Sequence, residues 1–176
     1  MNNMKTLYLD VDGTLSPFSS GAPRQNTGWK GEWRTVKVGS YNMLYSVELV
    51  DRLNALAEIP DVEIVWATDW VHEAPELLAP AIGLHGENWT FLEASASRMA
   101  DFYPWWKMEE IETHFTNTEA EVAIWADDNI RYASGIDTWR KRLGPDFYTM
   151  HTDKHHGLTV KNMVSIENAF TRLTPA

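Results

Sequence analysis

The chain has 176 residues, which suits one domain with a sizeable core, and its 44% hydrophobic and 23% charged residues are typical of a water-soluble globular protein. The net charge of −10 disfavours a general nucleic-acid coat protein, because phosphate backbones are held by positive surface. The absence of cysteine excludes disulfides, a thiolate zinc site and a cysteine nucleophile. No apolar run approaches the roughly 20 residues of a membrane span, and the start lacks a signal-peptide core, so we expect a cytoplasmic protein.

The first motif is an apolar run that ends in two carboxylates, Leu-Tyr-Leu-Asp-Val-Asp-Gly-Thr-Leu at residues 7–15. The apolar part predicts a short buried strand, and Asp10 and Asp12 stand where its backbone leaves the sheet. Strand alternation places both carboxylates on one side, and like charges that close need a cation, a shared proton or separate functions. A strand followed by an ordinary Asp-Gly turn explains the same residues.

Residues 16–46 follow this strand, and their later part predicts a β-hairpin around Gly39 and Ser40. Between residues 24 and 37 four cations oppose one carboxylate, and two tryptophans share the stretch. One interpretation is a surface hairpin whose tryptophans pack on the body of the protein. The other is a flap over Asp10 that binds an anionic, base-containing substrate with cations and ring faces, supplied by Trp29, Trp33 and Arg34.

A βαβ unit is predicted next. Ser46 can cap a helix that runs to about Glu58, and residues 62–67 form a second buried strand. This spacing makes the second strand parallel to the first, so that its end lies beside Asp10. There Thr68 offers a hydroxyl, and the backbone amides that follow, from Asp69 onward, can face an anion. A threonine at a strand end is usually structural, so Thr68 alone carries little weight.

The middle of the chain predicts a short helix bounded or bent by Pro75 and Pro80, a strand over residues 89–92, and a helix over residues 108–115. Lys107 stands next to the start of this last helix, after an aromatic stretch. A cation gains nothing from the helix dipole there, although a surface lysine is the simpler interpretation.

Residues 121–129 repeat the opening pattern, with an apolar strand that ends in Asp127 and Asp128. At a strand end one carboxylate can meet a metal directly while the other holds a metal-bound water or Lys107. The alternative is a helix cap formed by Asp128 or Asn129. A further strand over 146–150 and a last helix over about 160–173 complete the prediction, and the histidines between them lack the spacing of a zinc site.

These residues follow the order of the four motifs of the haloacid dehalogenase (HAD) superfamily of phosphatases and phosphotransferases, which the chain resembles. The motifs are Asp-x-Asp-x-Thr/Val, a Ser or Thr that ends the next strand, a Lys or Arg, and an acidic pair. They correspond here to Asp10 to Thr14, Thr68, Lys107, and Asp127 with Asp128. The first motif is a highly specific match, and the resemblance covers essentially the whole chain apart from residues 16–46.

The resemblance implies an α/β fold, a Rossmann-like three-layer sandwich with a central, mostly parallel sheet. It would form a single domain over residues 1–176, with residues 16–46 as a small flap after the first strand. It also implies a Mg²⁺-dependent phosphomonoester hydrolase that reacts through an aspartyl-phosphate, and a second acid at position 12 favours phosphoester chemistry over carbon-halogen hydrolysis.

The resemblance also assigns roles to individual residues. Asp10 would be the nucleophile and a metal ligand. Asp12 would be the general acid and then the base, with its backbone carbonyl on the metal. Thr68 and Lys107 would stabilise the transferring phosphoryl group. Other residues complete the expected site: Asp127 and Asp128 on the metal, and Thr14 and Asp69 beside the substrate.

The stretch between Thr68 and Lys107 has no room for a folded cap domain, so only the flap can cover the site. Similar minimally capped members often act on bulky substrates such as polynucleotide ends or phosphoproteins, and some take nucleotides. The basic, tryptophan-bearing flap favours a nucleotide or a nucleic-acid end. The alternative is a non-catalytic protein of this fold that holds a phosphorylated ligand or partner, although four clustered carboxylates argue against a decayed site.

Overall fold

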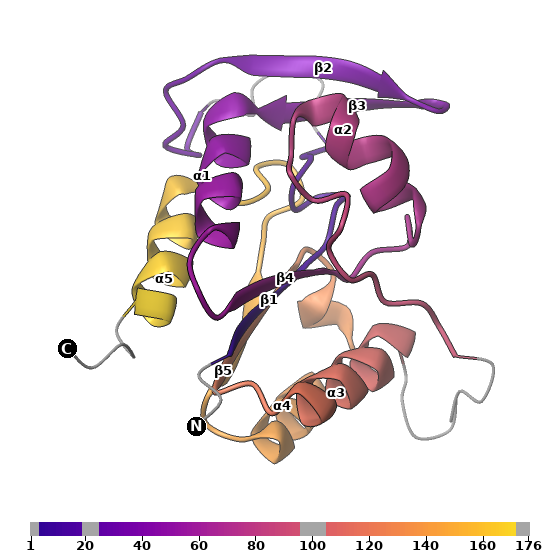
Figure 1. The fold of residues 1–176 in the computed structure, drawn as a ribbon, viewed down its shortest axis with the longest axis vertical. Helices are drawn as coiled ribbons and strands as arrows, with labels where there is room; N and C mark the ends of the chain where they lie inside the picture. The colour runs from indigo at the N-terminus through magenta and orange to yellow at the C-terminus, as the bar shows by residue number, and fades with distance from the viewer. Residues whose placement is uncertain (1–3, 19–24, 96–104, 172–176) are drawn as a thin grey trace.

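A computed structural model describes residues 4–18, 25–95 and 105–171. Its central sheet has four parallel strands in the order β4-β1-β5-β6 (Figure 1). They are β1 (Lys5–Leu9), β4 (Val62–Trp66), β5 (Val122–Asp127) and β6 (Phe147–His151). Leu9 is in register with Trp66 on one side and Ala126 on the other, and Asp127 is in register with His151. The carboxyl ends of all four strands therefore lie along one edge.

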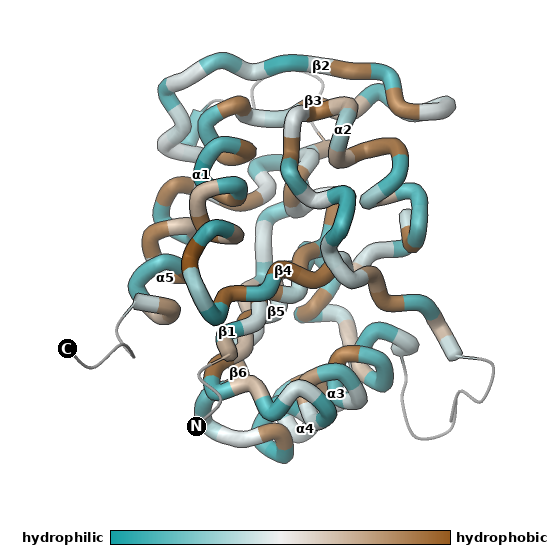
Figure 2. Tube along the Cα trace, viewed as in Figure 1, coloured by the Kyte–Doolittle hydropathy of each residue, from teal (hydrophilic) through white to brown (hydrophobic). Residues whose placement is uncertain are grey.

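Helices cover both faces of this sheet, as Figure 1 shows. One face packs against α1 (Val47–Ala57) and α5 (Val160–Thr171), and the other against α3 (Trp106–Thr118) and α4 (Ile136–Leu143). Alternate residues of β1 enter the two cores, because Leu7 and Leu9 belong to the first and Tyr8 to the second. Strands that are buried on both faces need continuous apolar runs, which Figure 2 shows as brown segments along the centre. The predicted three-layer α/β sandwich is confirmed.

Helix α1 begins where its cap was predicted. Ser46 has extended backbone, and its hydroxyl oxygen accepts a hydrogen bond from the Leu49 amide at 3.3 Å. The helix buries an apolar stripe formed by Leu49, Val50, Leu53 and Leu56. It then returns the chain to β4, parallel to β1 as the βαβ spacing predicted.

The predicted hairpin is present as β2 (Trp33–Val38) and β3 (Tyr41–Ser46), which pair antiparallel around Gly39 and Ser40. It lies beyond α1 in Figure 1, at the far side from α3 and α4. The buried side chains of Val38, Met43 and Tyr45 join the core that contains α1. The hairpin therefore extends this core. Within the predicted flap of residues 16–46, residues 19–24 lie outside the described residues.

The segment after β4 differs from the prediction in one respect. A helical stretch is present as a π-helical turn at Ala74–Leu78 followed by α2 (Ala79–Ile82), and it ends at Gly83 with φ of 76°. Residues 89–92 do not form a strand, because Phe91 makes only one bridge to Trp66. The side chains of Thr90 and Phe91 are exposed, so this run has no second face to bury.

The predicted helix over residues 108–115 begins earlier, at Trp106, so that Lys107 lies inside its first turn. Met108 and Ile111 are buried as expected. Part of the aromatic stretch before it, at residues 102–104, lies outside the described residues. Across the described ranges, none of the helices combines the length and apolar character needed to cross a bilayer.

Candidate active site

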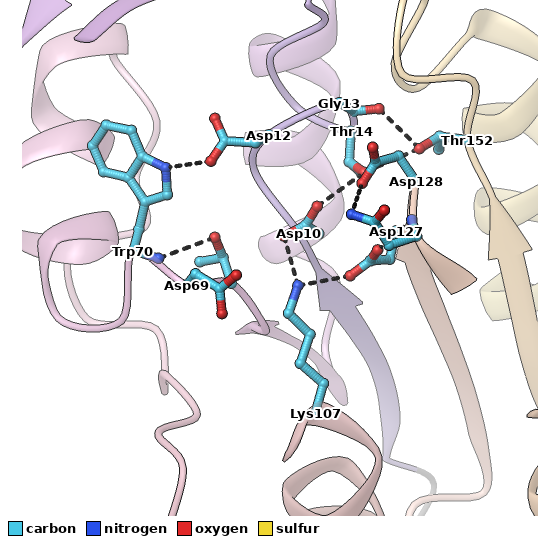
Figure 3. Close-up of polar contacts among 12 residues, drawn as sticks. Asp10, Asp12, Gly13, Thr14, Asp69, Trp70, Lys107, Asp127, Asp128 and Thr152 are labelled. Carbon is cyan, nitrogen blue, oxygen red and sulfur yellow. Dashed lines mark hydrogen bonds and ion pairs between the residues drawn. The ribbon is translucent and has the colours of Figure 1, made fainter. Parts of the chain in front are cut away.

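Side chains from all four strand ends meet at the carboxyl edge of the sheet (Figure 3). Asp10 follows β1, and its amide donates a hydrogen bond to the Ala126 carbonyl at 3.1 Å. Asp127 ends β5, while Thr68 and Thr152 follow β4 and β6. This edge is the usual ligand site of an open parallel sheet.

Lys107 lies between two carboxylates. Its Nζ atom is 2.8 Å from Oδ1 of Asp10 and 2.7 Å from Oδ2 of Asp127. Only 2% of the Lys107 residue is exposed, and its ammonium also lies 4.9 Å from the centre of the Trp105 ring. Burial by itself would lower the pKa of Lys107, but the charges and hydrogen bonds of the two carboxylates outweigh burial and raise that pKa. The surface-lysine interpretation is therefore wrong.

Asp10, Asp127 and Asp128 form a buried cluster. Each offers a carboxylate oxygen, and these oxygens all lie within 4.8 Å of one another. Asn129 supports two of them: its amide donates to Oδ1 of Asp127 and its side chain donates to Oδ1 of Asp128, both at 2.8 Å. The helix-cap alternative does not describe Asp128, whose carboxylate accepts from the Asn129 side chain. Asn129 does occupy the N-cap position of the next turn, at Ile130–Tyr132, but its side chain makes no cap hydrogen bond.

The cluster is electrostatically suited to a cation. With all three carboxylates ionised and Lys107 protonated, the cluster carries a formal charge of −2 among buried residues. Burial is the main cause that raises the pKa of Asp10 to about 8, against the opposing effect of Lys107. Burial, followed by the charge of Asp127, raises the pKa of Asp128 to about 6. Carboxylate oxygens are preferred ligands of Mg²⁺, so Asp10, Asp127 and Asp128 would hold such an ion and lose this excess charge.

Asp12 is held apart from this cluster. Its Oδ2 atom accepts a hydrogen bond from the indole Nε1 of Trp70 at 2.9 Å, and Figure 3 shows its carboxylate turned toward that ring. Trp70 in turn packs against Tyr41 at the start of β3, with 5.3 Å between ring centres. The two aspartates of the first motif therefore have different partners: Asp10 forms an ion pair with Lys107, and Asp12 accepts a hydrogen bond from Trp70.

The turn after Asp12 requires glycine. Gly13 has φ of +76°, and a Cβ atom there would lie 2.6 Å from Oδ2 of Asp128. Thr152 then ties the turn to β6, because its hydroxyl donates to the Gly13 carbonyl at 3.0 Å. The first motif and the acidic pair are thus in direct contact.

Thr14 and Thr68 are both buried, and of the two the structure gives only Thr14 a hydrogen bond to the carboxylate cluster. The Thr14 hydroxyl donates to Oδ2 of Asp10 at 3.4 Å and lies 3.0 Å from the hydroxyl of Thr152. The Thr68 hydroxyl accepts a hydrogen bond from the Trp70 amide at 3.3 Å. Asp69 is exposed and accepts a hydrogen bond from Nε1 of Trp106 at 3.0 Å.

The three flap residues predicted to bind substrate are not brought to the cluster. Trp29 is only 4% exposed, and its Nε1 donates to the Leu158 carbonyl at 2.8 Å. Trp33 is partly buried against the same core, and Arg34 pairs with Glu32 at 2.8 Å on the surface. The physical reason is that the hairpin needs apolar side chains to attach it to α1. The interpretation in which the tryptophans of this stretch pack on the body of the protein is therefore correct.

Sequence reasoning missed two site residues, Thr152 and Trp70, and gave Asn129 only as a possible cap. Thr152 follows the fourth parallel strand, so the rule that strand ends share an edge would have found it. Trp70 carries no comparable signal, because its role depends on the direction of one indole N–H toward Asp12.

The fold is a parallel α/β sandwich, and one edge of its sheet carries an Asp-x-Asp turn, a buried lysine and an acidic pair. This combination defines a domain of the HAD superfamily. Residues 6–163 match the family model described as the HAD domain in Swiss Army Knife RNA repair proteins, and the chain belongs to this family. No curated protein and no solved structure matches the chain.

Proposed function

We propose that this protein is a Mg²⁺-dependent phosphomonoester hydrolase that acts on phosphorylated nucleic-acid ends or nucleotides. The observation that carries this proposal is the separation of the two aspartates of the first motif. Lys107 and the acidic pair surround Asp10, while Asp12 is bound to Trp70 instead. One carboxylate is thus placed for attack beside a cation site, and the other is available for proton transfer.

In the proposed reaction an oxygen of Asp10 attacks phosphorus and the bond to the leaving oxygen breaks, with Asp12 donating the proton to that oxygen. Water then attacks phosphorus of the aspartyl-phosphate, Asp12 takes its proton, and inorganic phosphate leaves as Asp10 is regenerated. Lys107 orients Asp10 and, with the Thr68 hydroxyl, supplies hydrogen bonds to the phosphoryl oxygens. Bound Mg²⁺ would supply positive charge to the transferring phosphoryl group.

The family supports the substrate class. Its description refers to RNA repair proteins, in which a terminal phosphate of a broken strand is a natural target for a phosphatase. A chain with a net charge of −10 is not a general nucleic-acid binder, so recognition would be local to the site.

The test is hydrolysis by the purified protein with Mg²⁺ of p-nitrophenyl phosphate and of a panel of nucleotides, sugar phosphates and 3′- or 5′-phosphorylated oligonucleotides. Asp10→Asn should abolish turnover and keep the fold by circular dichroism. Asp51→Asn, on the exposed face of α1, is the matched control and should keep full activity.

No turnover of any phosphomonoester by the wild type would overturn the proposal. If calorimetry then still showed Mg²⁺ binding, the result would favour a non-catalytic protein that holds a phosphorylated ligand or partner.

A further inference from the structure

The loop after β5 presents an aromatic ring to solvent next to the carboxylate cluster. A 3₁₀ turn over Ile130–Tyr132 buries Ile130 and leaves Tyr132 68% exposed, which is the largest exposed fraction among the described large hydrophobic side chains. Tyr132 is four positions after Asp128 in the chain, and its amide donates to the Asn129 carbonyl at 2.9 Å. The turn therefore holds the backbone of Tyr132 close to the site.

A cation covers this ring. The guanidinium carbon of Arg131 lies 4.8 Å from the ring centre, and its Nη2 donates to the Tyr132 hydroxyl at 2.7 Å. Such a contact orients the ring and occupies one of its faces. Because Tyr132 is 68% exposed, its ring still has surface on which a second flat group can stack.

Two hollows meet at Tyr132. The first, of about 400 Å³, is lined by Asp69, Trp105, Asn129 and Tyr132. The second, of about 330 Å³, also includes Asn129 and Tyr132, and it reaches Asp128 itself. A molecule with its phosphate at the carboxylate cluster would therefore extend past Tyr132 on either side.

The second hollow holds two cations that can contact a backbone phosphate, next to the carboxylates of Asp128 and Asp153. Arg131 and Lys154 line it together with His151 and His155. Asp153 is also present, but it lies 3.3 Å from Nδ1 of His156, and its carboxylate accepts a hydrogen bond from the His155 amide. The cations of this hollow are thus next to the site, whereas Arg34 of the hairpin is paired with Glu32.

We propose that Tyr132 and Arg131 form a base-binding site for single-stranded nucleic acid. The base of the nucleotide that carries the scissile phosphate stacks on Tyr132, and the next backbone phosphate lies in the hollow of Arg131 and Lys154. Base stacking on aromatic rings combined with nearby cations is the usual way in which proteins hold single strands. The inference rests on the proposed phosphatase function, and it moves substrate recognition from the hairpin to the loops after β5 and β6.

The test compares kcat/KM for phosphorylated oligonucleotides that have, or lack, the base on the phosphate-bearing nucleotide, at either end. The wild type should prefer the intact end by roughly ten-fold or more, the effect typical of one stacked base. Tyr132→Ala should remove this preference, and Tyr132→Phe should retain most of it because it keeps the ring. Tyr148→Ala is the matched control, because Tyr148 is an exposed tyrosine within β6 that lines neither hollow.

Three results would overturn the inference: no preference for the intact end in the wild type, an equal loss on intact, abasic and p-nitrophenyl phosphate substrates in Tyr132→Ala, or faster turnover of a phosphopeptide than of any oligonucleotide. Each of these leaves the hydrolysis of p-nitrophenyl phosphate by the wild type in place. The absence of that hydrolysis is instead the failure of the proposed function.

Discussion

The indole N–H of Trp70 donates a hydrogen bond to Oδ2 of Asp12, with 2.9 Å between nitrogen and oxygen. Trp70 is almost fully buried, and its ring contacts Tyr41 of the hairpin. The hairpin thus reaches the site indirectly, through the orientation of one carboxylate. This arrangement makes Trp70 a positioning residue for Asp12.

Trp70→Phe should therefore slow the hydrolysis of alkyl phosphates more than that of p-nitrophenyl phosphate. An alkoxide is a poor leaving group and needs the proton that we propose Asp12 donates, whereas p-nitrophenolate leaves without it. General acid catalysis contributes about 10²–10⁴-fold, so we expect a loss of roughly ten-fold or more in kcat for alkyl substrates when the acid is misplaced. Steady-state kinetics with a series of leaving groups measures this difference.

Phenylalanine keeps a ring against Tyr41, which separates the lost hydrogen bond from lost packing. Equal losses for all leaving groups would show that Trp70 acts only in the structure of the domain.

A second prediction concerns Gly13. Gly13→Ala adds the cost of a left-handed residue, about 1–2 kcal/mol, and its Cβ would meet Oδ2 of Asp128 at 2.6 Å. We expect a loss in the free energy of unfolding above this cost and weaker Mg²⁺ binding, because Asp128 must move. Urea unfolding and calorimetric titration measure the two effects.

Gly39→Ala is the matched control for this change. Gly39 also has a positive φ, of 57°, but a Cβ atom there would have no heavy atom within 4 Å. Gly39→Ala should lower the free energy of unfolding only by the cost of the left-handed backbone, and it should leave Mg²⁺ binding unchanged. If both variants bound Mg²⁺ equally well, the contact between the turn and Asp128 would not matter for the cation.

The third prediction is a pH dependence of Mg²⁺ binding. Burial raises the pKa of Asp128 to about 6 and that of Asp10 to about 8. A metal ligand must lose its proton, so Mg²⁺ should bind more tightly as the pH rises from 5 to 8 and should release protons when it binds. Calorimetry in buffers of different ionisation enthalpy counts these protons.

The same pKa values set the sign of a stability effect without metal. Because the pKa values in the folded protein lie above the ordinary value of about 3.9, the two groups favour folding below about pH 4. Their contribution is lost as the pH rises through the folded pKa values, and excess Mg²⁺ should restore it. Mg²⁺ that stabilised the protein equally at pH 5 and pH 8 in urea unfolding would contradict these raised pKa values.

The sequence by itself determined the layered fold and the main acidic residues. Apolar runs such as residues 7–9 and 122–126 are local patterns, and the order of strand, helix and strand makes the strands parallel. Asp10 and Asp127 follow such runs, so they had to meet at one edge. The same reasoning predicted a strand at residues 89–92, but Thr90 and Phe91 are exposed there and only Phe91 bridges β4.

Only the tertiary structure decided which partner each polar or aromatic side chain has. Lys107 becomes part of the site because α3 carries its ammonium into the space between Asp10 and Asp127. Trp29 does not lie in the predicted substrate site, because its large apolar ring is buried in the core. The direction of the Trp70 N–H toward Asp12 likewise depends on a contact between residues far apart in the chain, which no local pattern encodes.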